Sequence, residues 1–173
     1  MSIRPGWFWH ENEEPHSLTK LYKTWLTSYG ANACMHLNIP PNNKGLIDER
    51  DVKRLAELGE LLQKEFGAPI LTCKKPQKEE DSFDYQPIYR IPLPAPLPQQ
   101  ALRHIVLREE IALGQRVESF KVKARYQNGR CYSIYEGTCI GNRKIIPLNA
   151  SGELFVHITA SRDIPELLPI ELY

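Results

Sequence analysis

A polar stretch from Lys74 to Asp84 divides the chain into two parts with different hydrophobic periods. Before it, apolar residues recur every three or four positions, the spacing of helices that bury one face. After it, apolar and polar residues alternate, the spacing of strands that bury one side. Runs of one element followed by runs of the other predict an α+β chain with two regions. We therefore predict a first region over 1–73, a linker over 74–85 and a second region over 86–173.

The first region is predicted to contain a helix, a strand and a second helix. One helix covers about 17–29, where apolar side chains keep helical spacing. The second begins after Asp48, a residue type suited to an N-cap, and closes at Gly67. Between them, the mostly apolar run 33–39 is bounded by Gly30 and two prolines, which predicts a strand covered on both faces. The predicted buried stripe of the second helix consists of Val52, Leu55, Ala56, Leu62 and Phe66.

The second region is predicted to be an antiparallel β-sandwich. Alternation is clearest over 117–126, where Phe120, Val122 and Ala124 alternate with basic residues, as in a half-buried strand. Several short strands separated by turn residues such as Gly141-Asn142 are typical of a sandwich. The other predicted strands lie near 88–92 and at 102–107, 131–135, 144–148, 154–159 and 168–172.

Length and charge exclude several classes of protein. A complete (β/α)8 barrel needs roughly 250 residues, so 173 residues are too few for a self-contained barrel enzyme. The net charge is +1, with basic and acidic residues mixed along the chain, so we expect no nucleic-acid or membrane partner. The segment 1–7 has no apolar core of the kind a signal peptide requires. We expect a soluble chain whose compartment stays undecided.

The four cysteines do not have the spacing of a zinc or redox site. Cys131 and Cys139 are close enough in sequence to face each other across two strands, but a lone cysteine is usually a small apolar residue. We expect no metal and no cofactor.

Several segments resemble α-L-fucosidases of glycoside hydrolase family 29. The run 37–52, which begins Leu-Asn-Ile-Pro-Pro, resembles the end of the catalytic barrel. The segments 106–120, 135–146 and 158–165 resemble the galactose-binding-like β-sandwich that follows the barrel in bacterial and plant members. The segment 2–10, Ser-Ile-Arg-Pro-Gly-Trp-Phe-Trp-His, resembles a stretch shortly after the general acid/base in the 1,3/1,4-selective branch. The resemblance implies a C-terminal part: the last helix-strand-helix of a (β/α)8 barrel, then an abbreviated sandwich.

The resemblance implies a substrate class but no complete active site. Family members hydrolyse α-L-fucosides by a retaining mechanism, with two carboxyl groups about 5 Å apart. The Asp nucleophile of the family is absent from this chain, and the acid/base falls before Met1. Glu11, Glu13 and Glu14 fit a solvated loop. We assign no catalytic residue and expect a fucosylated glycan, and the missing barrel portion, as partners. The family is often periplasmic, secreted or lysosomal.

Five side chains are candidates for contact with a sugar. A tryptophan ring can cover the apolar face of a sugar, and an arginine can donate to its hydroxyls. The same residues also suit structural roles, in which the rings anchor a loop or pack a helix and the histidine forms loop hydrogen bonds. Both interpretations stay open here. The candidates are Arg4, Trp7, Trp9, His10 and Trp25.

Two residues of the 33–39 run are expected to be structural. His36 alternates within an apolar run, which favours a buried, hydrogen-bonded histidine, although a barrel strand would end at the catalytic mouth. Asn38 is expected to cap the end of the strand through its side chain.

Three hypotheses follow for the function. The chain is the C-terminal part of an α-L-fucosidase without turnover of its own, or a non-catalytic accessory module that binds carbohydrate or protein. The third makes it a subunit that completes a barrel supplied by another chain. We favour the first.

Overall fold

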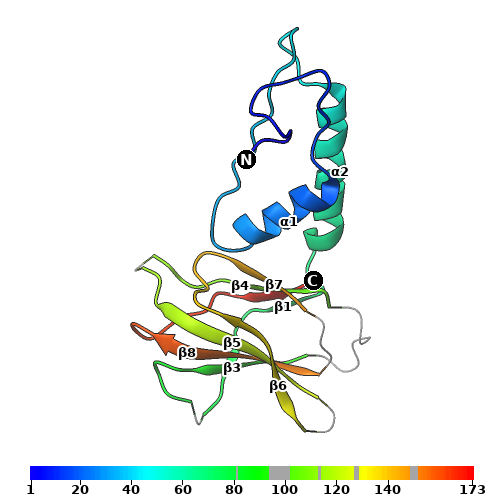
Figure 1. Ribbon diagram of the computed structural model, residues 1–173. Helices are drawn as coiled ribbons and strands as arrows, with labels where there is room; N and C mark the ends of the chain where they lie inside the picture. The colour runs from blue at the N-terminus through cyan, green and yellow to red at the C-terminus, as the bar shows by residue number, and fades with distance from the viewer. Residues whose placement is uncertain (81, 94–101, 113, 127–128, 149–151) are drawn as a thin grey trace. The chain divides into compact units, whose positions relative to one another are not determined.

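The structure is a computed structural model that describes residues 1–80, 82–93, 102–112, 114–126, 129–148 and 152–173. It divides into two compact units, Met1–Ala68 and Pro69–Tyr173. Unit 1 contains helices, and unit 2 contains strands, as Figure 1 shows. The predicted α+β class is confirmed.

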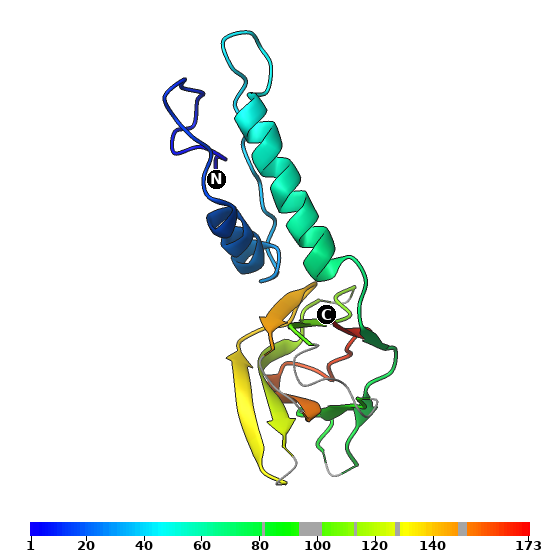
Figure 2. The ribbon, with the colours of Figure 1, turned by 90° about the vertical axis from the view of Figure 1, so that its right-hand side faces the viewer.

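Unit 1 is built on two helices, α1 (Leu18–Ser28) and α2 (Glu49–Phe66). Each begins at a polar N-cap: the Ser17 hydroxyl accepts from the backbone N–H of Lys20, and Asp48 accepts from that of Arg50. These side chains satisfy N–H groups that the first turn of a helix leaves free. Figure 2 shows α2 as the longer helix, with the segment before it running alongside. The core residues are Ile3, Leu21 and Leu58, with Leu18, Tyr22, Leu37, Ile39, Leu55 and Leu62 around them.

Three sequence predictions about unit 1 are wrong, the first of them in part. In α2, Val52 is half exposed and Ala56 is exposed, whereas Asp51 and Leu58 are buried. Leu55 and Leu62 of the predicted stripe do pack against the core, so apolar spacing located this face in part, but it missed the buried carboxylate. The run 33–39 is not a strand covered on both faces, because it forms one bridge, between Asn38 and Ser2, and its first two residues are exposed. His36 is exposed rather than buried.

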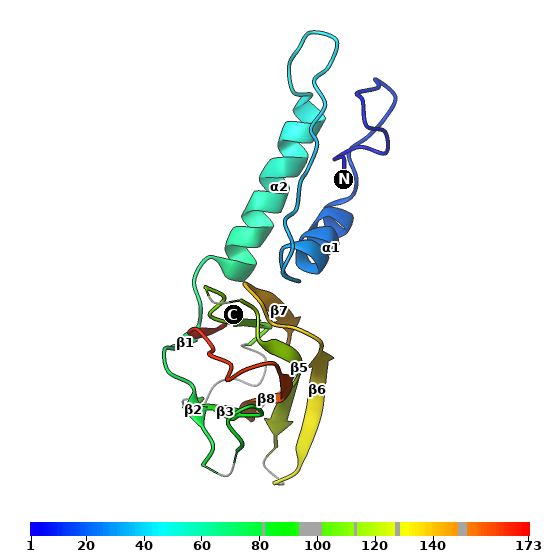
Figure 3. The same ribbon diagram turned by 90° about the vertical axis from the view of Figure 1, so that its left-hand side faces the viewer.

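Unit 2 contains two antiparallel sheets. One has the order β1-β9-β4-β7, and the other has the order β2-β3-β8-β5-β6. In Figure 3, β6 lies at an edge of unit 2, as the order requires. The strands are β1 (Leu71–Cys73), β2 (Gln77–Lys78), β3 (Ile88–Ile91), β4 (His104–Leu107), β5 (Val117–Arg125), β6 (Cys131–Gly137), β7 (Lys144–Pro147), β8 (Glu153–Ser161) and β9 (Ile170–Leu172).

The core of unit 2 draws side chains from both sheets. In β5, Phe120, Val122 and Ala124 are at most 1 % exposed, and the basic residues between them face outward. The predicted alternation is therefore confirmed, and the two sheets bury one apolar layer as a sandwich. Other members of this core are Ile91, Ile105, Leu107, Ile146, Leu154, Val156, Ile158, Ile170 and Leu172.

The structure divides the chain differently from the predicted ranges. Residues 71–73, assigned to the first region, form β1, which pairs with β9, and Cys73 joins the core of unit 2. The polar stretch over 74–85 contains β2, whose two residues pair with β3. Strands this short carry too few residues to show a period. The four cysteines are free thiols.

A buried glutamate joins three segments of unit 2. Glu109 is 1 % exposed. Its Oε1 accepts from the backbone N–H groups of Arg116, at 2.5 Å, and Val117, at 2.9 Å, and Oε2 accepts from that of Gly141, at 3.3 Å. The carboxylate thus satisfies backbone donors that would otherwise be buried without partners.

We expect Glu109→Ala to lower the free energy of unfolding of unit 2 by about 2 to 4 kcal/mol, because three backbone donors lose their acceptor. Hydrogen exchange of the β5 and β8 amides measures the loss. Glu118→Ala is the matched control, since Glu118 is exposed and pairs with the exposed Arg162. Equal protection in both variants would contradict the assignment.

Candidate functional site: an aromatic loop held by Arg4 and Asp48

The N-terminal loop of unit 1 is held by one buried arginine. Arg4 is 0 % exposed, and its Nε donates to both carboxylate oxygens of Asp51, at 3.1 and 2.8 Å. Its Nη1 donates to the backbone carbonyls of His10, at 3.0 Å, and of Glu13. One guanidinium therefore ties α2 to two points of the loop.

Asp48 is the second anchor. Its Oδ2 accepts from the indole N–H of Trp9, at 2.9 Å, and pairs with Arg50 at the same distance. Arg4 Nη2 lies 3.3 Å from the same oxygen, within ion-pair range but not oriented as a hydrogen bond. The hydrogen bonds from Arg50, and next that from Trp9, hold the pKa of the Asp48 carboxyl well below its usual range. The N-cap of α2 thus also positions an aromatic ring of the loop.

Asn38 fixes the loop from the other side. Its Nδ2 donates to the backbone carbonyl of Trp7, at 2.7 Å, and to the Ser2 hydroxyl, at 3.2 Å. Its backbone pairs with Met1 and Ile3. Asn38 was predicted to cap the end of a strand. In the structure its side chain instead holds the aromatic loop.

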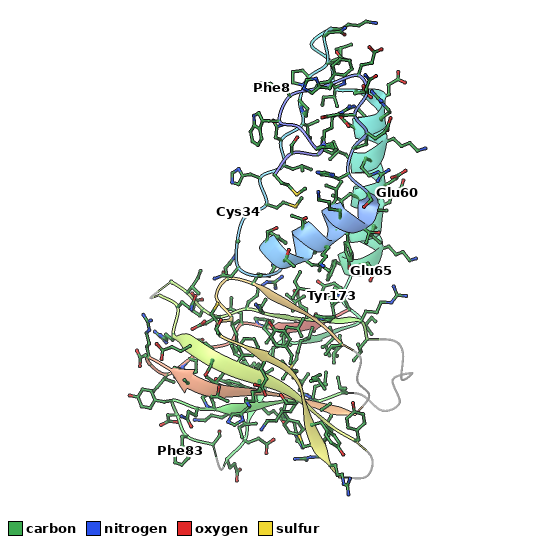
Figure 4. The ribbon with its side chains drawn as sticks, viewed as in Figure 1. Phe8, Cys34, Glu60, Glu65, Phe83 and Tyr173 are labelled. Atoms are coloured by element: carbon green, nitrogen blue, oxygen red, sulfur yellow. The ribbon has the colours of Figure 1, made fainter. Side chains whose placement is uncertain are left out.

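The loop backbone is thus fastened while two of its rings are free. The Trp7 side chain is 62 % exposed and that of Phe8 is 74 % exposed; Figure 4 shows Phe8 on the outer side of the loop. His10 is also exposed. A rigid backbone that presents apolar rings loses little entropy when a flat apolar ligand face binds. Sequence reasoning missed Phe8, although it lies between two predicted site residues.

The five predicted site residues separate into two groups. Trp7 and His10 face solvent, whereas Trp9 is partly buried and its indole N–H donates to Asp48. All three lie on the loop. The guanidinium of Arg4 is occupied by the chain's own acceptors, so its position does not support donation to a sugar hydroxyl. Trp25 lies apart from the loop on α1, where its ring packs against Tyr29 and Phe66 at centroid distances of 5.0 and 5.1 Å.

The acidic residues of the loop are engaged locally. Glu14 Oε1 pairs with Arg50 at 2.8 Å, and Glu13 Oε2 accepts from the backbone N–H of Gly6 at 3.3 Å. These are the contacts of structural carboxylates. Across the described ranges, no group of three or more metal-binding side chains comes together, and no helix is long and apolar enough to cross a membrane. The loop offers apolar rings, an imidazole and backbone groups to a ligand.

The sequence of this chain is similar to those of two curated plant proteins. α-L-Fucosidase 1 of Arabidopsis thaliana is 28% identical over 187 residues, which cover 95% of this chain and 36% of that protein. "Putative alpha-L-fucosidase 1" of Oryza sativa subsp. japonica is 32% identical over 168 residues, covering 84% of this chain and 32% of its own length. The chain is homologous to α-L-fucosidases. It spans about a third of the length of these curated relatives, and no family model matches it.

Solved structures reproduce the fold across both units. The crystal structure of SpGH29 matches 99% of this chain and 42% of its own, with a TM-score of 0.88 and 28% identity. A Ruminococcus gnavus GH29 fucosidase, solved in complex with fucose, matches with a TM-score of 0.76 over 99% of this chain and 40% of its own. At 19% identity that match concerns the fold alone. The predicted sandwich, and its relation to the α-L-fucosidase sandwiches, are thus confirmed.

We expect Asp51→Ala to lower the free energy of unfolding of unit 1 by about 3 to 5 kcal/mol, because the buried Arg4 Nε loses the carboxylate that accepts its hydrogen bonds. All three tryptophans lie in unit 1, so urea unfolding followed by tryptophan fluorescence isolates this effect. Glu60→Ala, an exposed change on the same helix (Figure 4), is the control. A loss of unfolding free energy no larger than that of the control would contradict the stabilising role of the Arg4–Asp51 ion pair.

Acid should weaken unit 1 through Asp48. The folded pKa of this carboxyl lies below its unfolded value of about 4, so its contribution is complete above about pH 4 and is lost as pH falls through the folded pKa. Trp9→Phe removes one hydrogen bond and raises the folded pKa, so acid unfolding should begin at higher pH. Fluorescence of Trp7 and Trp25 against pH measures the shift, with Trp25→Phe as the control. Identical acid profiles for the two variants would rule out the Trp9 contribution.

Proposed function

We propose that the chain is the C-terminal part of an α-L-fucosidase of glycoside hydrolase family 29, in the 1,3/1,4-selective branch. In this proposal unit 1 is the end of the (β/α)8 catalytic barrel, and unit 2 is the β-sandwich that follows it. The intact enzyme would hydrolyse α-L-fucosides by a retaining mechanism with two carboxyl groups. The 173 residues themselves supply part of the substrate pocket and no turnover.

One observation carries this proposal: the match to α-L-fucosidases covers both units. A shared sandwich alone would be weak evidence of function, because that architecture serves many functions. Here the likeness to SpGH29 covers 99% of the chain, including the loop, both helices and both sheets. A helical unit and a sandwich occurring together in one order favour a common enzyme architecture over a separate binding module.

The exposed loop supports a role at the rim of the pocket. L-Fucose is a 6-deoxy sugar, so its methyl group and C–H edges form an apolar surface that an aromatic ring can cover. We propose Trp7 as the ring that contacts the sugar and His10 as a donor or acceptor for its hydroxyls. Arg4 and Trp9 act indirectly by holding the loop. Trp25 packs against Tyr29 and Phe66 at the C-terminal ends of α1 and α2.

Unit 1 also exposes apolar side chains that suit contact with a larger barrel. Leu46 is 63 % exposed, Ile47 49 % and Val52 51 %, all at the start of α2 or in the loop before it. Apolar side chains gathered in this way usually mark an interface. The remaining portion of the barrel, in the same chain or in another, is the proposed occupant, as in the hypothesis of a completing subunit.

A second candidate function rests on unit 2. Phe83 is 77 % exposed and Tyr85 55 % exposed, and both lie between β2 and β3 (Figure 4 labels Phe83). Exposed aromatic rings on a loop are common contact points for glycans and proteins. This favours an accessory module that binds carbohydrate or protein, which Phe83→Ala would weaken and Trp7→Ala would not.

We expect the 173-residue chain to release no fucose from an aryl α-L-fucoside, because it lacks the family's nucleophile. A chimera of the Arabidopsis α-L-fucosidase 1, in which this chain replaces the matching third, should hydrolyse the substrate. Trp7→Ala in that chimera should lower kcat/KM by about tenfold or more, the effect of one lost ring contact.

Two controls make the chimera decisive. Trp25→Phe keeps the packing on α1 and should leave kcat/KM within about twofold. Circular dichroism and gel filtration establish that the chimera folds. A folded chimera without activity would contradict the proposed function, and so would turnover by the 173-residue chain alone.

A further inference from the structure

The outer face of the five-stranded sheet carries three nitrogen-bearing side chains close together. Lys121 and Lys123 lie on β5, and His157 lies directly opposite Lys121 on β8. Their neighbours in sequence, Phe120, Val122 and others, point into the core, so these three point outward. In Figure 1, β8 runs between β3 and β5, so the cluster lies near the middle of the sheet and not at its rim.

The cluster is short of negative charge. Lys121 Nζ pairs with Glu136 Oε1 on β6 at 2.8 Å, and Glu136 is itself mostly exposed. Lys123 pairs with no carboxylate of the described chain; its Nζ lies 3.2 Å from His157 Nδ1. Opposite Lys123 on β6 stands Ser133, a neutral hydroxyl. The partner of the His157 ring nitrogen is thus the ammonium group of Lys123 and not a carboxylate.

The strand on the other side adds no acid at this point. Ile88 of β3 lies opposite His157, and the next outward residue, Arg90, faces Glu79 and Glu153 at 3.7 and 3.8 Å. Farther along β5, Arg125 pairs with Glu153 at 3.2 Å. Glu79 and Glu153 are thus shared by arginines. Glu136 remains as one acid beside two lysines, whose hydrogen bond and charges lower its pKa, so the net charge of the cluster stays positive.

We propose that Lys123 and His157, with Lys121 beside them, form a binding site for a small oxyanion such as sulfate or phosphate, either free or carried on a sugar. An oxyanion between the two side chains accepts hydrogen bonds from the Lys123 ammonium and from the imidazole ring. It also supplies the missing negative charge. The site lies on the sandwich and does not depend on the proposed fucosidase function.

The site should respond to pH. Burial, then the positive charges of Lys123 and Lys121, lowers the pKa of His157 in the free protein. A bound anion reverses the effect of that charge, so it raises the pKa and binds more tightly as pH falls through it. The ammonium groups of both lysines stay charged throughout this range.

Nuclear magnetic resonance of the His157 imidazole in the full chain tests the proposal, with inorganic sulfate as the probe and sodium chloride at matched ionic strength as the reference. We expect sulfate, but not chloride, to raise the pKa of His157. We expect Lys123→Gln to weaken sulfate binding about tenfold, the value of one charge-assisted hydrogen bond. Lys53→Gln, the same charge change on exposed α2, should leave it unchanged.

Further arms identify the ligand. A response to sulfate and phosphate without one to acetate assigns a tetrahedral anion, and a response to all three assigns the wider oxyanion class. Dextran sulfate competing better than sulfate, with dextran inactive, assigns an anion carried on a glycan. An unchanged His157 resonance in sulfate, or equal losses for Lys123→Gln and Lys53→Gln, would overturn the proposal.

Discussion

The buried contact between Arg4 and Asp51 is the interaction on which unit 1 depends. A charge removed from water is costly unless a partner and further hydrogen bonds surround it. Arg4 meets that condition with a carboxylate of α2, 47 residues away along the chain, and with two carbonyls of its own loop. Because a guanidinium is planar and has five donors, it can hold all of these at once, which a lysine cannot. The N-terminal loop keeps its form because this one group occupies its centre.

The sequence predicted elements wherever a repeating pattern coincided with packing. Strands β3 to β9 were expected at their observed places, because short apolar or alternating runs bounded by turn residues coincide with the sheets. Strand β5 alternates between core and solvent, and β4 is buried at all four positions. The start of α2 was expected from Asp48, because aspartate before a helical run is a preferred N-cap residue. Patterns failed where a polar residue is buried. Asp51 lies on the inner face of α2. A pattern of hydrophobic residues cannot predict that a carboxylate is buried while the neighbouring Val52 is exposed.

The candidate site was predictable in composition but not in geometry. The aromatic run 7–9 was visible in the sequence, yet nothing in it told which rings are free. That depends on Asn38 and Asp48, which lie 31 and 39 residues away from the groups that they hold. Arg4 looked like a ligand for a sugar because a charged residue in a loop usually faces water. Its partner lies too far along the chain for local reasoning to pair the two.

The position of β9 in its sheet has a consequence for how unit 2 is made. This strand lies between β1 and β4, so it joins the earliest strand of the unit to the rest of its sheet. During synthesis, β1 leaves the ribosome about a hundred residues ahead of β9 and waits without a neighbour on the sheet. Its unpaired edge is then available to chaperones or to another nascent chain. The four-stranded sheet can close only after residues 170–172 have emerged.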